Sequence, residues 1–306
     1  MTISSRPSVR RLALFTLNLI CLSAGPVLAE SFRTAFPAVW ENVDDETRSI
    51  LNGIEVETGS VTLGTSGASL TLPEGYYFID AKGSKLVLED LWGNPPDIPP
   101  LGMIFPHDAS PLHDTWGATV EFDPLGYVSD EDAADMDFTA LLKDMQADTL
   151  AANPELSKLG YPQVTLIGWA EPPHYDRTAR ELYWAKELHF EGSDDNILNY
   201  NIRELGRRGV MVINFIASMQ QLDEVRSVVP DVLKMVEFSE GHRYADFVPG
   251  TDTVAALGVG GLIAGKVLSK AGLLAILAVV LKKGGFLIFL PLIWLFNWFR
   301  GRRSGT

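Results

Sequence analysis

The fold is decided by the stretch "ELYWAKELHFEGSDDNILNYNIRELGRRGVMVINFIAS", residues 181–218. Three runs within it, 181–190, 197–205 and 210–218, are rich in β-branched and aromatic residues, which favour strands. The turn sequences "EGSDDN" and "GRRG" separate these runs at hairpin spacing. Because hairpins join antiparallel neighbours, the stretch predicts an antiparallel sheet and argues against a fold built on parallel crossovers.

The flanking sequence adds one strand and one helix to this sheet. Before it, "PQVTLIGWAEPP" predicts a strand that ends at Pro172 and Pro173, since proline cannot donate to a ladder. After it, the apolar spacing of residues 219–238 predicts a helix that is interrupted or restarted at Pro230.

A longer helix is expected in "GYVSDEDAADMDFTALLKDMQADTLAANPEL", residues 126–156. Ser129 is its expected N-cap, and Asp132 follows three residues later in a near capping box. The helix dipole favours the acids in this first turn.

The N-terminal third predicts shorter elements. Residues 59–80 form an expected β-hairpin followed by a Pro-Glu-Gly turn, and residues 85–92 form an amphipathic helix that the prolines of "WGNPPDIPP" terminate. "LGMIFP" and "WGATVEFD" are strand candidates. One short helix is expected earlier, with a common apolar face made of Val39, Trp40 and Val43.

Together these elements predict an α+β fold, a mainly antiparallel sheet with helices packed on it. Residues 30–252 are expected to form one domain, because no linker divides them. A C-terminal membrane helix, or a pair of helices, is expected to follow.

The charge of this domain is strongly negative. Residues 30–252 hold all 39 acidic residues of the chain and 15 of its 25 basic ones, a formal charge of about −24. Such a body repels nucleic-acid phosphates and anionic lipid headgroups, so both are excluded as ligands of the domain. A basic partner is allowed.

The first 29 residues are predicted to be a secretory signal. Arg10 and Arg11 precede the apolar run 12–22, and "VLAE" predicts cleavage after Ala29, with an uncleaved anchor as the alternative. The single cysteine, Cys21, lies inside this signal, so the mature chain has no thiol for a disulfide, a metal or a nucleophile. Export without disulfides suits a bacterium.

Near the other end, "GGFLIFLPLIWLFNWF", residues 284–299, predicts a short transmembrane helix. The preceding lysines can snorkel outward, and the basic residues of 300–306 should lie in the cytoplasm by the positive-inside rule. A core helix is excluded because the run has no polar face. The same run could be a C-terminal sorting signal that a protease removes. Such signals usually follow a flexible spacer, whereas a helix-like segment precedes this run, so this alternative is disfavoured.

Residues 253–281 leave two topologies open. Lys266 and Lys270 share one helical face, which predicts an interfacial helix, while a second span would make a hairpin and place the C-terminal arginines outside. Gly261 and Gly265 have the small-xxx-small spacing of helix pairs, so helices could self-associate there.

Two clusters of possible metal ligands are weak candidates for a metal site. The acids Asp130, Asp132, Asp135 and Asp137 fail the spacing of an EF-hand loop. "HDASPLHD" holds two His and two Asp (His107, Asp108, His113 and Asp114), but its histidines are six residues apart in a loop that contains proline. A solvated loop is the expectation.

The only acid–base candidate lies in "PPHYDRTAR". His174 and Asp176 could act as a base and its orienting partner, although no serine lies in a nucleophile-elbow context. Asp176 is better explained as a turn residue, with Arg177 as its local partner. No catalytic, cofactor-binding or metal-ligating residue is therefore assigned, and no cofactor is expected.

Several ordered motifs resemble those of one family. They are "LTLPEGYYFID", "LWGNPP", "GMIFP", "GYVSDEDA", "GWAEPPHYD", "LYWA", "LNYNIRELGRRGV" and "YADFVPGTD", followed by the Gly- and Lys-bearing apolar tail. The chain resembles, over about residues 59–283, the bacterial membrane-anchored proteins called domain of unknown function 2167. The resemblance implies an exported, anchored protein, and it brings no reaction, ligand or catalytic residue.

The sequence thus favours a binding or scaffolding protein of the bacterial envelope. The domain is expected in the periplasm, or otherwise outside the cytoplasm, held by the inner membrane and contacting an unidentified envelope protein. One alternative is a membrane-tethered hydrolase that uses His174 and nearby acids, and another is a small-ligand sensor.

Overall fold

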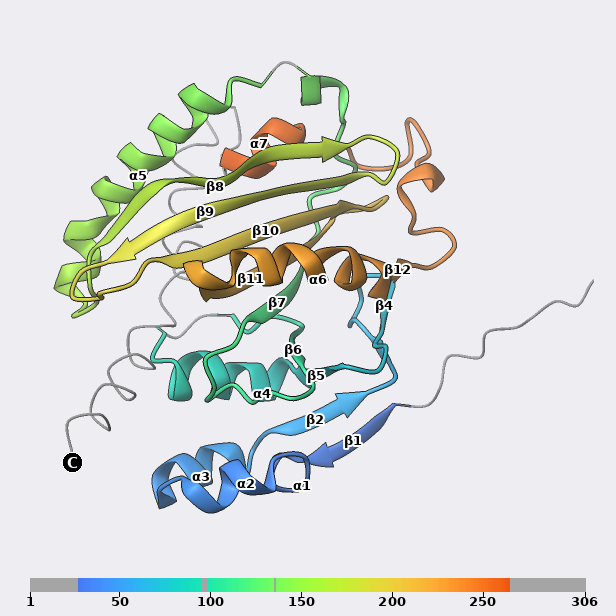
Figure 1. Cartoon of the computed structure of the whole chain (residues 1–306). Coiled ribbons are helices and arrows are strands. Elements are labelled where there is room, and N and C mark those ends of the chain that lie inside the picture. Colours follow the sequence, from blue (N-terminus) through green and yellow to red (C-terminus); the bar gives the residue numbers. More distant parts are fainter. Residues whose placement is uncertain (1–26, 95–97, 135, 265–306) are drawn as a thin grey trace, which may run out of the picture.

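The computed structural model describes residues 27–94, 98–134 and 136–264. Its main feature is a nine-stranded antiparallel sheet (Figure 1). In spatial order the strands are β1 (Leu28–Ser31), β2 (Glu55–Thr58), β5 (Tyr76–Asp80), β6 (Gly102–Pro106), β7 (Gly117–Asp123), β11 (Val210–Ser218), β10 (Ile197–Leu205), β9 (Glu181–Phe190) and β8 (Val164–Asp176). A smaller sheet joins β12 (Val236–Phe238), β4 (Ala68–Thr71) and β3 (Ser60–Thr62).

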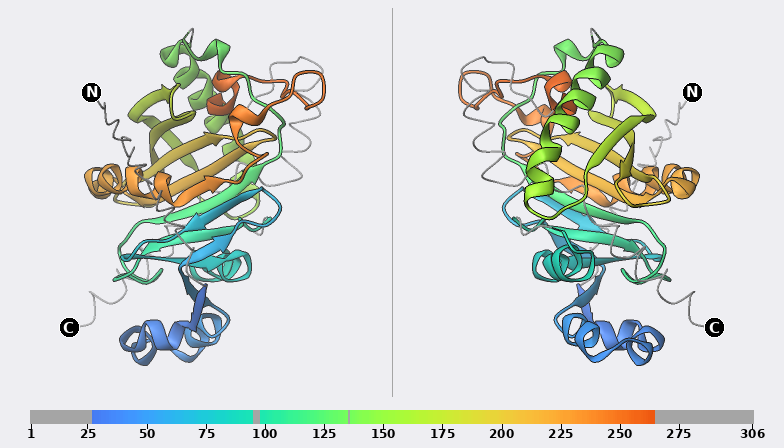
Figure 2. Two further views of the ribbon diagram at one scale, coloured as in Figure 1. Left: turned by 90° about the vertical axis from the view of Figure 1, so that its right-hand side faces the viewer. Right: turned by 90° about the vertical axis from the view of Figure 1, so that its left-hand side faces the viewer.

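Helices cover both faces of the large sheet. They are α1 (Phe32–Ala35), α2 (Pro37–Asn42), α3 (Asp45–Leu51), α4 (Ala81–Lys85), α5 (Phe138–Lys158), α6 (Leu222–Met235) and α7 (Val259–Ala264), with the π-helix η1 (Leu86–Leu91) and the 3₁₀ turns η2 (Glu131–Ala134), η3 (Met219–Gln221) and η4 (Tyr244–Asp246). α6 lies in front of β10 and β11 in Figure 1, and α5 runs along β8. Helices α1 to α3 form the lower end of the molecule (Figure 2).

Alternation along the strands separates the two layers. Ala185 of β9 packs in the apolar cluster that contains α6, whereas its neighbour Trp184 packs with Val259 and Ile263 of α7. Successive residues of a strand point to opposite faces, so α6 and α7 cover opposite sides of the sheet.

The predicted fold class and the central strands are confirmed. The sheet is antiparallel throughout, and β9, β10 and β11 begin and end where the sequence predicts. The predicted hairpin within 59–80 is β3 and β4. These segments were predictable because each combines apolar alternation with turn residues at both ends.

The expected start of the long helix was wrong. α5 begins at Phe138, and its N-cap is Asp137, whose Oδ1 accepts hydrogen bonds from the N–H groups of Thr139 and Ala140 at 3.0 Å. Ser129 instead accepts from the N–H of Glu131. The acids of this segment bond to distant residues, and this tertiary use overrides the local capping pattern.

Proline did not end two elements where it was expected to. β8 continues through Pro172 and Pro173, which is possible because β8 is an edge strand with register shifts at this point. α6 passes Pro230 without interruption and ends at Met235. The helix expected from residue 85 begins earlier, at Ala81.

A buried polar row crosses the sheet on the α7 side. Lys186 pairs across strands with Asn199, and Asn201 pairs with Asn214, which pairs with Thr119. All five side chains are at most 5 % exposed. Apolar clusters flank the row at both ends, so it is a polar interruption of the core.

The predicted membrane and export segments fall mostly outside the described residues. Among the helices of 27–94, 98–134 and 136–264, none has the length and apolar character needed to cross a bilayer. The span 284–299, the lysines of 266–270 and the signal up to residue 26 are outside these ranges and stay predictions. The predicted cleavage position after Ala29 falls within β1, where Ala29 pairs with Glu57.

Candidate functional site

Four of the sequence motifs meet at one end of the large sheet. "GYVSDEDA" follows β7, "PPHYD" ends β8, "GRRG" joins β10 to β11, and "YADFVPGTD" precedes α7. We call the contacts among them the C-terminal clamp, because they fix residues 244–264 against the sheet domain. Its central residues are Tyr127, Asp130, Asp132, Arg207 and Asp252.

The carboxylate of Asp130 connects the loop after β7 to β8, to the turn between β8 and β9 and to η4. The hydroxyl of Tyr175 donates to Oδ2 at 3.0 Å, and Arg180 forms an ion pair with the same oxygen. The hydroxyl of Tyr244 donates to Oδ1 at 3.4 Å and to the carbonyl of Val128 at 3.0 Å. Burial is the main cause that raises the pKa of Tyr175 to about 12, so this phenol stays a donor at neutral pH.

Aromatic rings form the second part of the clamp. The ring of Tyr127 stacks on Tyr244 at 4.5 Å and on Phe247 at 3.8 Å between centroids. The guanidinium of Arg180 lies 4.8 Å from the centroid of Tyr244, a cation–π distance. Arg180 has a positive φ of 64°, uncommon for a non-glycine residue, so the turn before β9 is held by these contacts.

Arg207 and Asp252 form a two-pronged ion pair. Nε donates to Oδ2 at 2.7 Å and Nη2 donates to Oδ1 at 3.0 Å, while Nη1 donates to the carbonyl of Gly241 at 3.1 Å. The same carboxylate accepts from the N–H of Val248 at 2.7 Å. Hydrogen bonding from Arg207 is the main cause that lowers the pKa of Asp252. Bidentate geometry of this kind fixes orientation as well as charge.

Backbone pairing and a helix cap complete the clamp. The N–H of Tyr127 donates to the carbonyl of Thr253, and the N–H of Ala255 donates back to Tyr127, both at 2.8 Å. The carboxylate of Asp132 accepts from the N–H groups of Val259 at 3.0 Å and Gly260 at 3.2 Å. The "GYVSDEDA" motif therefore holds both the strand-like approach to α7 and the first turn of α7.

Asp132→Ala is expected to weaken the docking of α7 by about 1–2 kcal/mol, since it removes the acceptor of two N–H groups at a helix start. Hydrogen exchange of residues 257–264 would measure the loss. The exposed neighbour Glu131 gives the control, and Glu131→Ala should change this exchange little. Equal exchange in the two variants would contradict the capping role.

The predicted acid–base pair does not assemble. His174 is exposed and its ring lies against Tyr183, with centroids 5.0 Å apart. Asp176 accepts from the N–H groups of Thr178 and Ala179, as expected for a turn residue, and these bonds lower its pKa. The expected partnership of Arg177 with Asp176 was wrong, because Arg177 donates to the carbonyl of Asp130.

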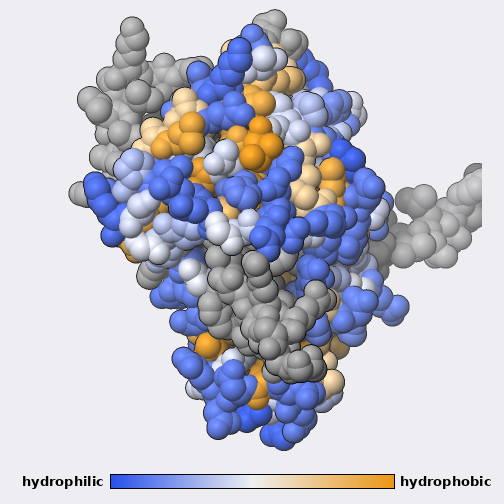
Figure 3. Space-filling model, turned by 60° about the vertical axis from the view of Figure 1, so that its left-hand side comes forward, coloured by the Kyte–Doolittle hydropathy of each residue, from blue (hydrophilic) through white to orange (hydrophobic). Residues whose placement is uncertain are grey.

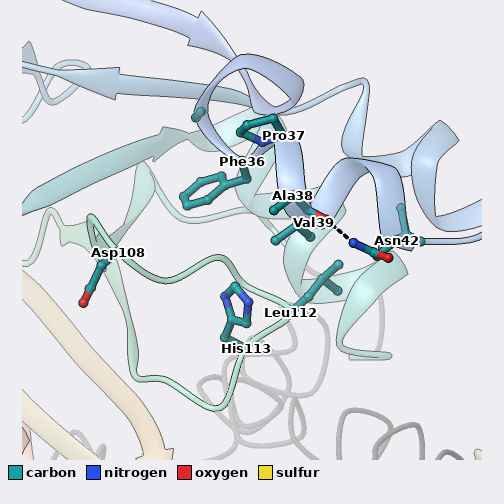
Figure 4. A pocket seen from close by; sticks show the side chains of 10 residues that line it. Phe36, Pro37, Ala38, Val39, Asn42, Asp108, Leu112 and His113 are labelled. Carbon is teal, nitrogen blue, oxygen red and sulfur yellow. Dashed lines mark hydrogen bonds between the residues drawn. The ribbon is translucent and has the colours of Figure 1, made fainter.

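The His- and Asp-bearing loop lies beside a pocket of about 470 Å³ (Figure 4). Asp108 and His113 line it together with Phe36, which lies between α1 and α2, and with α2 residues that include Val39. Nδ1 of His113 accepts from the N–H of Ser110 at 2.9 Å, which leaves Nε2 as the protonated nitrogen. The walls are mainly apolar, so the pocket suits a small apolar group better than a metal.

The acidic run is likewise occupied by protein contacts. Asp130 and Asp132 bind groups of the clamp and Asp137 caps α5, while Asp135 lies outside the described residues. Within 27–94, 98–134 and 136–264, no group of three or more His, Cys, Asp or Glu side chains has the arrangement of a metal site.

The surface on the α5 side is mostly hydrophilic where it is drawn in colour (Figure 3). The apolar areas on this face are small (Figure 3). Exposed large apolar side chains of the described residues include Leu150 of α5 and Ile167 of β8. Single exposed apolar residues are ordinary on protein surfaces and indicate no docking site.

Sequence reasoning missed the pairings that make the clamp. Arg207 and Asp252 are 45 residues apart, and Asp132 and Val259 are 127 apart. Each partner lies in a visible motif, but one sequence carries no information on which motifs touch. Covariation among relatives would be the signal able to find such pairs.

The fold and the clamp define a class: an α+β protein with an antiparallel sheet and a docked C-terminal segment. A family model described as "Protein of unknown function (DUF2167)" matches residues 55–293, and the chain belongs to this family. No curated protein matches the sequence.

Among solved structures, cyanobacterial PsbP (CyanoP) from Synechocystis sp. PCC 6803 is similar at 14 % identity, covering 59 % of this chain and 91 % of that one, with a TM-score of 0.34. The Ran-binding protein Mog1p of Saccharomyces cerevisiae is similar at 10 % identity, covering 62 % and 97 %, with a TM-score of 0.30. Scores this low carry no argument about function.

Proposed function

We propose that this chain is an exported protein anchored in the cytoplasmic membrane of a bacterium, where its acidic domain binds a protein partner of the envelope. The observation that carries the proposal is the C-terminal clamp. α7 is docked on the sheet by Val259, Leu262 and Ile263, which are at most 9 % exposed, and it ends just before the apolar sequence that begins at residue 265.

The clamp fixes the C-terminal end of the described domain against the sheet. A flexible linker would let a tethered domain rotate freely, whereas residues 244–264 are fixed by an ion pair, aromatic stacking and a helix cap. Such a fixed base suits a protein that must present one surface to a partner at a set distance from the bilayer. The charge of about −24 over residues 30–252 favours a partner with basic groups.

Cell fractionation tests the anchor. The full chain is expected in the membrane fraction, resistant to high salt and released by detergent, whereas a chain that stops after Ala264 should be soluble. A full chain that washes off in salt would contradict the anchor.

A reporter fused after Thr306 tests the orientation. The single-span topology places this end in the cytoplasm, so an export-dependent reporter should be inactive there. Activity at this position would favour the two-span hairpin, whose first span would then have to lie after residue 264, because residues 253–264 are docked on the sheet.

The two alternatives receive unequal support. The hydrolase requires His174 and Asp176 to act together, but the histidine lies against Tyr183 and the aspartate is held by turn N–H groups. The pocket beside His113 gives the small-ligand sensor one specific observation. His113→Ala should then abolish a ligand-induced rise in melting temperature, which a screen of small, mainly apolar molecules on the full chain would reveal.

A further inference from the structure

Three carboxylates lie in line across neighbouring strands on the α6 side of the sheet. Asp176 of β8 is paired with Glu181 of β9, and Glu181 is paired with Glu204 of β10. Directly opposed side chains in an antiparallel sheet lie within about 5 Å at Cβ, and like charges in these positions repel. The row is at the end of the sheet where β8 turns into β9 (Figure 1).

Glu204 is the unusual member of this row. Its Oε2 is shielded from solvent and has no hydrogen-bond partner in the part of the chain that the structure describes. Burial, with a smaller contribution from Glu181, raises the pKa of Glu204 to about 8. Buried carboxyl oxygens normally have partners, so this oxygen has room for one that the described residues do not supply.

Two arginines of the adjoining elements are bound elsewhere. Arg180, in the turn between β8 and β9, pairs with Asp130 on the clamp. Arg226 of α6 pairs with Glu171 at 2.7 Å. The charges that act on Glu181 and Glu204 come from carboxylates: Asp176 raises the pKa of Glu181, and Glu181 raises that of Glu204.

The row is still accessible from outside. Asp176, Glu181 and Glu204 are each partly exposed, and Tyr183 beside them is partly exposed as well. A cation entering from solvent could therefore approach both side chains, and a turn of the Glu204 side chain would bring its shielded Oε2 to the cation. Arginine fits this arrangement because its planar fork carries several donors and can bridge two carboxylates.

We propose that Glu181 and Glu204 form a receptor for one arginine side chain of a protein partner. The inference rests on the proposed binding function and names the chemistry of the partner. With the Glu204 side chain turned outward, the guanidinium would donate to the unpartnered Oε2 and would neutralise the repulsion of Glu204 with Glu181. Asp176 would add attraction to the site, and its Oδ1 already accepts from two turn N–H groups.

The test uses the detergent-solubilised full chain, so its outcome does not depend on whether the membrane anchor is correct. A fluorescein-labelled Gly-Arg-Gly-Arg-Gly peptide is titrated at physiological salt, and the lysine counterpart is titrated in parallel. Glu181→Gln/Glu204→Gln should weaken binding of the arginine peptide roughly tenfold or more, as expected for lost charge-assisted hydrogen bonds.

The matched control is Glu41→Gln/Glu46→Gln, which replaces the same number of carboxyl groups at two exposed positions, one in α2 and one in α3. It should change affinity less than about twofold if general attraction to a negative protein is screened by salt. Equal weakening in both double variants would overturn the proposal, as would tighter binding of the lysine peptide. Circular dichroism confirms that each variant folds.

A pH series gives a second readout that general attraction does not produce. Arginine binding favours the ionised form of Glu204, so affinity for the wild type should increase between about pH 7 and pH 9. Glu204→Gln should remove this increase. A flat profile in the wild type, or an unchanged slope in the variant, would overturn the assignment to this pair.

Discussion

Gly126→Ala is expected to release the C-terminal clamp while the sheet stays folded. Gly126 has a φ of 89°, and a Cβ at this position would lie 2.6 Å from the backbone oxygen of Thr253. A left-handed conformation costs a residue with a side chain about 1–2 kcal/mol. The contact with Thr253 cannot be relieved by turning a side chain, so the backbone pairing of Tyr127 with residues 253–255 must separate.

The expected loss is roughly 2–4 kcal/mol in the local free energy that holds residues 244–264, from strain plus two backbone hydrogen bonds. Hydrogen exchange should therefore speed up in α7 and in the loop before it, and much less in β10 and β11. In the cell, the variant should stay in the membrane fraction but lose partner binding that depends on a fixed orientation.

Gly250→Ala separates strain from the clash. Gly250 lies in the loop that contains Thr253 and has a φ of 77°. Nothing lies within 4 Å of the position of an added Cβ. This control should show only the cost of the left-handed conformation. If both variants loosen residues 244–264 equally, the close approach of residue 126 to Thr253 does not hold the segment.

These glycines show what one sequence can predict and what it cannot. The strands β9 to β11 were predictable because alternation and turn residues are local signals. The role of Gly126 depends on Thr253, and Asp130 and Tyr244 are 114 residues apart, so no local pattern points to them. The same limit applies to Ser129, which has the correct residue type for a cap but is followed by acids that serve distant groups.

The pair Glu181 and Glu204 shows that correct strand boundaries alone do not reveal a site. Both residues lie in strands whose boundaries were correctly predicted, so their alternation places them on one face once the register is known. Register between hairpin strands depends on turn geometry, and a shift by one residue would move either glutamate to the opposite face. The candidate receptor therefore became visible only with the strand pairing.

Lys186→Met is expected to stabilise the protein at neutral pH and to change how its stability depends on pH. Lys186 is 5 % exposed, and burial, together with the nearby charge of Arg203, lowers its pKa from 10.5 to about 7. In the unfolded chain the amine keeps an ordinary pKa, so between about pH 7 and 10.5 the unfolded state binds more protons than the folded state. Stability contributed by this site therefore increases with pH through that window.

The size of the effect follows from the gap between the two pKa values. The gap corresponds to on the order of 4–5 kcal/mol by which the charged amine destabilises the folded state below about pH 7. Relaxation of the surroundings reduces this amount. Methionine has a similar volume and no charge to desolvate. We expect the free energy of unfolding at pH 7 to rise by roughly 2–4 kcal/mol, and the difference between variant and wild type to shrink towards pH 10.

Urea unfolding of the detergent-solubilised full chain at several pH values would measure this difference, and comparison with the wild type cancels the titration of other groups. Lys143→Met, at an exposed position of α5, is the control and should change stability by less than about 0.5 kcal/mol. A strongly destabilised Lys186→Met would show that favourable contacts of the ammonium outweigh its desolvation. The buried polar row that includes Lys186, Asn199 and Asn201 would then stabilise the folded state, and would not destabilise it.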